Sequence, residues 1–312
     1  MKNVSLEQYI AYWDNWHKEW FVHTKTTKKI QDWKIPHGSG RQENIISKYF
    51  PEPYYYVGRG DSELKAIFIN INPGEGGASQ DIEKKESSEW YGCYQKVNHA
   101  YSTAMTQVLE QKNGTAAFFS KRINWANELM KTKGGCQPTE VLCADLIPWH
   151  TKKESDIMDY LRDKDNRKAI INRVIMPLLK VAKTNQGVLK NKIIVRGIAF
   201  MNLINHFYKL NPLEINKRKL NEKIKSRKLH RVKQFIVLDG DQFLDKFNSF
   251  LTVINFGGVD ICIFSGGASM ELPKAEYMVY PINNAGEPPM MLKEFLGAKD
   301  SLPSSKAKVV PS

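Results

Sequence analysis

The stretch 66–77, AIFININPGEGG, joins a short apolar run to an abrupt polar ending. Residues 66–71 are apolar enough for a buried strand, and Asn72, Pro73 and Gly74 then interrupt it. In an open α/β sheet, ligands bind beyond the carboxyl ends of the strands, because helices cover both faces. The stretch therefore predicts a strand that presents Asn72 at a ligand-binding edge. An ordinary turn is the alternative, since Asn-Pro and Pro-Gly are common turn dipeptides.

Strand and helix patterns alternate through the rest of the chain. Apolar periodicity predicts helices at 6–20 and 156–183, the second as one helix or a pair, and further strands at 140–147, 192–198, 235–238 and 259–264. Such alternation is typical of a parallel sheet with covering helices. We therefore predict an α/β fold with three layers, α/β/α, around a central, mainly parallel sheet.

The domain organisation follows from the same patterns and from changes in composition. We predict an N-terminal helical and extended segment, 1–60, that packs on an α/β domain at 61–297. A basic insertion is expected near 211–233. A flexible tail is expected at 298–312, where Pro, Ser and Lys accumulate.

The charge balance favours a polyanionic partner. The 312 residues include 46 Lys and Arg against 33 Asp and Glu, a formal charge of +13, and the sequence pI is about 9.4. These values are typical of nucleic-acid-binding domains, although a merely basic soluble protein is the alternative. The densest basic stretch is 217–233. We expect phosphate contacts there from Lys217, Arg218, Lys219, Arg227 and Lys228.

The four cysteines are scattered without a CxxC pair, which argues against zinc ribbons, disulfide frameworks and iron-sulfur clusters. The first 20 residues are too polar for a signal peptide, and no apolar run approaches the roughly 20 residues that a membrane span needs. We expect a cytoplasmic protein without a membrane association. No metal, cofactor or obligatory protein partner is predicted.

The motif NINPG at 70–74 resembles the first catalytic motif of the uracil-DNA glycosylase superfamily, which reads Gly-x-Asn-Pro-Gly in its mismatch-specific and single-strand-selective branches. The resemblance implies that Asn72 positions the attacking water. Asn70 departs from the family's Gly. Gly74 stands where strict uracil enzymes place a Tyr that blocks 5-substituted pyrimidines, so a bulky 5-substituent could be admitted. The implied substrate-binding residues are Asn70, Pro73, Gly74, Glu75, Trp90 and Tyr91. Tyr94 is a third candidate for stacking on the base, and we expect at least two of these three rings to belong to the core instead.

The strand EVLCADLI at 140–147 carries one charged residue in its interior, Asp145, and a buried carboxylate is costly unless it is paired or functional. In the resembling family an Asn near this position reads the edge of uracil. An ionised Asp accepts hydrogen bonds only, which suits the amine of cytosine. An ion pair with a Lys, or a cap on the following turn, is the alternative. His150 is a catalytic candidate or a polar loop residue.

A second loop follows the strand predicted at 259–264 and reads SGGASM. The superfamily places its second motif after the last strand, where it pinches the phosphate backbone and inserts a side chain into the emptied stack. The resemblance is one of position, because the family's His or Asn for the leaving base is absent; a plain loop is the alternative. The implied DNA contacts are Ser265, Gly266, Gly267, Ser269 and, as the wedge, Met270.

Together these features predict a monofunctional DNA glycosylase that flips a nucleotide from duplex or single-stranded DNA and hydrolyses its N-glycosidic bond. Asp145 and Gly74 favour a 5-substituted cytosine, such as the glucosylated hydroxymethylcytosine of phage DNA, and some phage-defence glycosylases resemble this superfamily. The alternatives are a uracil or mismatch glycosylase in repair and a noncatalytic nucleic-acid-binding module. A nucleotide hydrolase is disfavoured, because no Gly-Lys-Ser/Thr follows the glycine-rich loop.

Overall fold

The structure is a computed structural model of the chain. It describes residues 4–23, 29–30, 32–34, 45–46, 49–58, 63–71, 94, 97, 100–111, 116–131, 134–151, 154–185, 188–189, 192–196, 200, 203, 232–239, 242–243, 250–256, 258–264, 272–282 and 288–297. The predicted tail at 298–312 lies outside these ranges. So does the predicted basic insertion, apart from residues 232 and 233.

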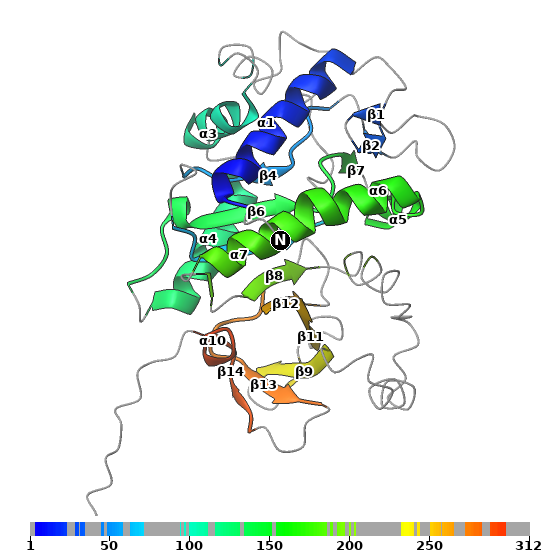
Figure 1. Cartoon of the computed structure of the whole chain (residues 1–312). Coiled ribbons are helices and arrows are strands. Elements are labelled where there is room, and N and C mark those ends of the chain that lie inside the picture. Colours follow the sequence, from blue (N-terminus) through cyan, green and yellow to red (C-terminus); the bar gives the residue numbers. More distant parts are fainter. Residues whose placement is uncertain are drawn as a thin grey trace, which may run out of the picture.

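Ten of the described strands form one mixed sheet (Figure 1). Its order is β14-β13-β9-β11-β12-β8-β5-β6-β4, and β10 pairs with β9. Two small sheets, β1-β2 and β3-β7, lie apart from it. The strands of the large sheet are β4 (Tyr54–Tyr55), β5 (Ala66–Asn70), β6 (Val141–Asp145), β8 (Lys192–Arg196), β9 (Val232–Asp239), β10 (Gln242–Phe243), β11 (Phe250–Phe256), β12 (Val259–Phe264), β13 (Met278–Pro281) and β14 (Met290–Met291).

Four adjacent strands, β12, β8, β5 and β6, run parallel to one another. The remaining pairings of the large sheet are antiparallel. An α/β fold whose central strands are parallel is therefore confirmed. The expectation of a mainly parallel sheet needs correction, because β9, β11, β13 and β14 add an antiparallel half. Their short connections explain this: β11 and β12 are separated by two residues, which is enough for a hairpin and too few for a crossover helix.

Helices lie in front of and behind the parallel strands in Figure 1, where α7 crosses in front of the sheet and α4 lies behind it. The predicted helix or helix pair at 156–183 is divided into α5, α6, a π-helical turn η6, and α7. The described helices are α1 (Leu6–His23), α3 (Tyr101–Gln111), α4 (Ala116–Met130), α5 (Glu154–Tyr160), α6 (Lys164–Ile170), α7 (Met176–Thr184) and α10 (Leu292–Phe295), with the turns η5 (Pro138–Glu140) and η6 (Ile171–Ile175).

The aromatic stripe predicted on the first helix packs in the core. α1 buries one side, formed by Tyr9, Trp13, Trp16, His17 and Trp20, because these residues recur every three or four positions. The imidazole of His17 stacks on Tyr101 of α3, with ring centroids 4.3 Å apart. Its Nε2 donates a hydrogen bond of 2.8 Å to the carbonyl of Pro51. The stripe is therefore structural, and it fixes the segment that leads into β4.

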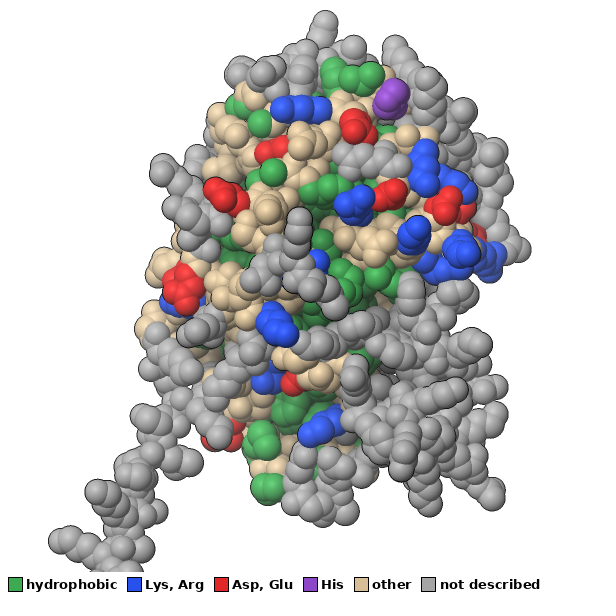
Figure 2. All heavy atoms as spheres, viewed as in Figure 1, with side chains coloured by type: hydrophobic (Ala, Val, Ile, Leu, Met, Phe, Trp, Pro, Cys, Tyr) green, Lys and Arg blue, Asp and Glu red, His purple; other side chains and the backbone are tan. Residues whose placement is uncertain are grey.

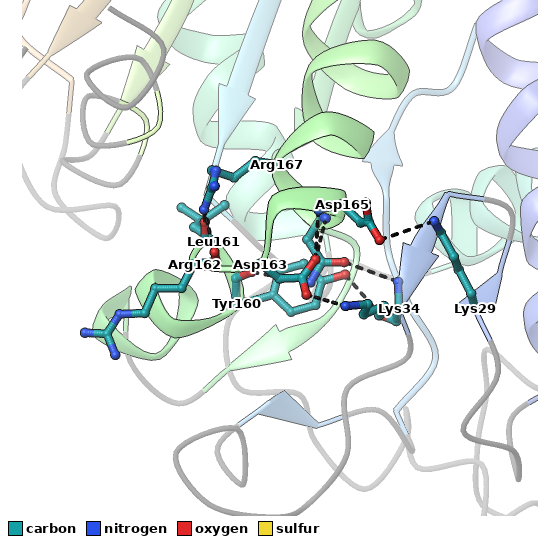
Figure 3. A network of polar contacts seen from close by, with 9 residues as sticks. Lys29, Lys34, Tyr160, Leu161, Arg162, Asp163, Asp165 and Arg167 are labelled. Carbon is teal, nitrogen blue, oxygen red and sulfur yellow. Dashed lines mark hydrogen bonds and ion pairs between the residues drawn. The ribbon is translucent and has the colours of Figure 1, made fainter. Parts of the chain in front are cut away.

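A polar network anchors the small β1-β2 sheet (Lys29–Ile30 and Trp33–Lys34) to the start of α6 (Figure 3). Asp163 caps α6 by accepting hydrogen bonds from the amides of Asp165 (2.8 Å) and Asn166 (3.1 Å). Lys34 forms an ion pair with the other Asp163 oxygen, and Lys29 lies 3.7 Å from Asp165. These contacts hold the N-terminal region against α6. None of the helices described here is both long and apolar enough to cross a membrane.

Candidate active site

Three polar side chains lie in a row at the carboxyl ends of adjacent parallel strands. Asn70 ends β5, Asp145 ends β6 and Arg196 ends β8. Asn70 is in register with Asp145, and the pairing of Ile69 with Val195 puts Arg196 beside Asn70. All three are buried, with exposed fractions of 6, 1 and 3%. The edge predicted from the first strand is thus lined with polar groups.

The same row faces α4. The indole of Trp125 contacts the rings of Phe68 on β5 and Phe264 on β12, with centroids 5.7 and 6.3 Å apart. Because residues two apart in a strand share a face, Asn70 lies on the face of Phe68. Arg196 is in register with Phe264 and shares that face. The row therefore lies between the sheet and α4, which also contributes the buried Arg122.

A second buried carboxylate, Glu52, comes from the segment that precedes β4. The amide of Glu52 donates to the carbonyl of Pro148 (3.0 Å), and the amide of Asp145 donates to the carbonyl of Pro53 (2.9 Å). These two bonds align Glu52 with the end of β6. Glu52 is 1% exposed, and its Oε2 accepts a hydrogen bond from the hydroxyl of Tyr55.

Asp145 is surrounded by groups that favour its neutral form. Burial raises the pKa of Asp145 well above its ordinary value, and the nearby carboxylate of Glu52 raises it further. The Asn70 side chain and the Arg122 guanidinium act in the opposite direction and do not outweigh these effects. We therefore expect Asp145 to hold its proton to a higher pH than an ordinary aspartate does. This changes the sequence-based reasoning, which assumed an ionised Asp145.

Nδ2 of Asn70 and Oδ2 of Asp145 are among the polar atoms of the row that lack a hydrogen-bonding partner within the described part of the chain. The Asn70 side chain is close enough to lower the pKa of Asp145, but its Nδ2 has no partner in hydrogen-bonding geometry. Leaving such buried atoms unpaired costs about 1 to 3 kcal/mol each. Adjacent strand ends with a free donor and a free carboxyl oxygen are suited to a flat ligand that carries both kinds of polar group.

The first strand leads directly into the motif. The carbonyls of Asn70 and Ile71 accept hydrogen bonds from the amides of Leu146 (2.9 Å) and Ile147 (3.2 Å). Pairing between the two strands thus continues to Ile71, the residue before Asn72. Asn72, Pro73, Gly74, Glu75, Trp90 and Tyr91 themselves lie outside the described residues. Their predicted roles stay predictions.

His150 and Tyr94 occupy positions away from the Asn70–Asp145 pair. His150 lies on β7 (His150–Thr151), fully buried, and its Nε2 donates to the carbonyl of Phe50 at 2.9 Å. The same nitrogen is 3.9 Å from Oε1 of Glu52, so His150 contacts the site through Glu52. Tyr94 is a core residue whose ring packs against Phe50 and His17, so it is one of the rings expected to belong to the core.

The predicted DNA-contact residues Lys217, Arg218, Lys219, Arg227, Lys228, Ser265, Gly266, Gly267, Ser269 and Met270 lie outside the described ranges. Figure 2 shows Lys and Arg side chains gathered over α5 and α6, with acidic side chains between them. Arg162 there is 2.8 Å from Asp159, and Lys34 pairs with Asp163. Acidic partners therefore neutralise much of this described patch, so the expected phosphate contacts have to be sought elsewhere.

Three buried charged residues of the site were missed by sequence reasoning: Glu52, Arg122 and Arg196. Glu52 and Arg196 carried a usable signal, since each is a charged residue inside an otherwise apolar or aromatic segment, PEPYYY and KIIVRGI. Arg122 carried none, because its helix has charged residues at several positions. The described residues hold no group of three or more His, Cys, Asp or Glu that could bind a metal ion.

Comparison of the chain with protein-family models, with curated proteins and with solved structures finds no match.

Proposed function

We propose that the chain is a DNA glycosylase that hydrolyses the N-glycosidic bond of a modified pyrimidine, with the base held against the carboxyl ends of β5 and β6. The observation that carries the proposal is the pair of unpartnered polar atoms on Asn70, two residues before Asn72 of the motif, and on Asp145, its buried neighbour on β6. The resemblance of NINPG to the first motif of the uracil-DNA glycosylase superfamily supports the same site, and a three-layer glycosylase-like architecture is part of the proposal.

In this proposal Asn70 and Asp145 bind the edge of the extruded base. A neutral Asp145 offers both an O–H donor and a carbonyl acceptor. It can pair with the acceptor N3 and the amine of cytosine, or with the N3–H and O4 of uracil. The preference for cytosine therefore rests on Gly74, which leaves room for a 5-substituent, and uracil or a mismatched base remains the alternative substrate.

The chemistry requires little beyond orientation and charge stabilisation. Asn72 orients a water molecule toward the anomeric carbon, where the new carbon-oxygen bond forms. The electrons of the broken carbon-nitrogen bond pass to the base, and the proton lost by the water ends on the released base or in solvent. The O–H of Asp145 donates a hydrogen bond to the base as negative charge develops on it, which stabilises the transition state more than the ground state.

Base release identified by mass spectrometry tests the proposal. The substrates are oligonucleotides that contain glucosylated hydroxymethylcytosine, hydroxymethylcytosine, uracil or unmodified cytosine. We expect free modified cytosine and one abasic site per target. Asn72→Ala should lower the rate by about 100-fold or more while DNA binding persists. Asp145→Asn, which keeps a donor and an acceptor, should retain more activity than Asp145→Ala. The matched control is Asp159→Asn, which changes a half-buried carboxylate on α5 that pairs with Arg162.

Two results would count against this function. If the wild-type chain binds DNA but releases no base from any substrate, the noncatalytic binding module is favoured. If release occurs but is unaffected in both the Asn72→Ala and Asp145→Ala variants, the chemistry lies at another site.

A further inference from the structure

Two arginines are buried at the same edge of the sheet. Arg196, the last residue of β8, is 3% exposed, and Arg122 on α4 is 5% exposed. Arginine is among the residues that are least often fully buried. Burial lowers the pKa of Arg196 to about 10 and also lowers that of Arg122. Because arginine is not deprotonated in proteins, both guanidinium groups keep their positive charge at neutral pH.

The two guanidinium groups lie close enough to repel each other. The charge of Arg122 is a cause of the lowered pKa of Arg196. Repulsion between like charges is stronger away from water, because the effective dielectric constant is lower there. The charge of Arg122 also interacts with the carboxyl group of Asp145, so both arginines lie near the proposed base-binding residues.

The strand order places the arginines where open α/β sheets bind ligands. The chain leaves β5 toward β6 on one side, and it leaves β8 toward β9 on the other side. Adjacent parallel strands whose connections depart in opposite directions form a crevice at their carboxyl ends. Asn70 and Arg196 are the residues that flank this position. Arg122 faces the same place from α4.

We propose that Arg122 and Arg196 form a binding subsite for one phosphate group beside the base-binding residues Asn70 and Asp145. The guanidinium group is planar and binds phosphate oxygens in a two-pronged manner, which a lysine ammonium cannot reproduce. The proposal rests on the proposed function in one respect: it takes the phosphate from the extruded nucleotide. The site then recognises a nucleotide as a unit, the base through Asn70 and Asp145 and the phosphate through the arginines.

Isothermal titration separates a phosphate subsite from a site for the base alone. The probes are deoxycytidine 5′-monophosphate, deoxycytidine and inorganic phosphate. We expect the monophosphate to bind the wild-type chain more tightly than the nucleoside, and inorganic phosphate to compete with it. Arg196→Lys and Arg122→Lys keep the positive charge but lose the two parallel N–H donors of the guanidinium group. Each variant should therefore weaken monophosphate binding by roughly 10- to 100-fold while nucleoside binding stays unchanged. The exposed Arg162→Lys is the matched control.

A second arm identifies the source of the phosphate. In oligonucleotides, the phosphodiester on each side of the target nucleotide is replaced in turn by an uncharged methylphosphonate. If the subsite takes a DNA phosphate, one replacement weakens binding to the wild-type chain and has little further effect in Arg196→Lys. If neither replacement matters while the free monophosphate binds through the arginines, the ligand is a free nucleotide.

The outcomes are distinguishable from failure of the proposed function. Arginine-dependent phosphate binding without any base release would support the phosphate subsite and contradict the proposed glycosylase activity. Equal affinity for nucleoside and monophosphate, or monophosphate binding that both lysine variants retain in full, overturns the subsite. Thermal melts of each variant confirm that a loss of binding is not a loss of folding.

Discussion

Asp145→Asn should change how the stability of the protein depends on pH. Because burial and Glu52 raise the pKa of Asp145, the folded chain holds a proton that the unfolded chain releases above the ordinary value near 3.8. This contribution to stability is fully present below the unfolded pKa and is lost as pH rises through the folded pKa. Within that window the free energy of unfolding falls by about 1.4 kcal/mol per pH unit.

Asparagine at position 145 has nearly the same shape and does not titrate, so the variant lacks this slope. As pH rises from the ordinary pKa of an aspartate toward the raised pKa of Asp145, the free energy of unfolding of Asp145→Asn should therefore rise relative to wild type by about 1.4 kcal/mol per pH unit. Urea titrations followed by tryptophan fluorescence at several pH values measure the difference. The buried Trp13, Trp16 and Trp149 supply the signal. All other titrating groups are common to both proteins, and their own pH dependence largely cancels in the comparison.

Parallel stability curves for the two proteins over that range would refute the reasoning. They would mean that Asp145 is already ionised in the folded chain, and the base contact would then revert to an acceptor-only carboxylate.

Three further predictions concern neighbouring groups. Glu52→Gln removes the carboxylate that helps to raise the pKa of Asp145, so the slope described above should level off at a lower pH in urea titrations. Asp163→Asn keeps a helix cap but loses the charge that faces Lys34. Burial acts to raise the pKa of Asp163, but its hydrogen bonds from Lys34 and the helix amides lower it overall, so the wild-type advantage should be present at pH 7 and disappear in melts as pH falls through the lowered pKa. Burial lowers the pKa of His17 to about 3, so wild-type stability should fall by about 1.4 kcal/mol per pH unit below pH 6.5, a loss that His17→Gln lacks.

Much of the central sheet could be predicted from sequence because its parallel strands consist mainly of consecutive apolar residues. β5, β6, β8 and β12 coincide with the predicted segments to within a few residues, and α1 matches its aromatic spacing. β11 and β13 were not predicted. β11 reads FLTVINF, where Thr252 and Asn255 interrupt the apolar residues, and it lies in an antiparallel hairpin, where one face tolerates polar side chains. Its pattern is therefore weaker than a continuous apolar run.

The site was only half predictable. Asp145 was identified because a lone carboxylate in an apolar strand is costly, and the same reasoning applied to Arg196 and Glu52 would have found them. Arg122 could not be found in this way, since the face that α4 turns toward the sheet depends on tertiary packing. Strand order was equally inaccessible, because pairing between β5 and β8 joins residues more than 120 positions apart. The pKa of Asp145 depends on Glu52, which only folding brings near.

The most direct test of the central claim is mass-spectrometric detection of the free base released from DNA that carries glucosylated hydroxymethylcytosine, with wild type, Asp145→Ala and Asp159→Asn compared side by side. The proposed site predicts release of the modified cytosine by wild type and by Asp159→Asn, with release by Asp145→Ala reduced by about 100-fold. Equal release by all three proteins, or no release by wild type from any modified or deaminated substrate, would contradict it.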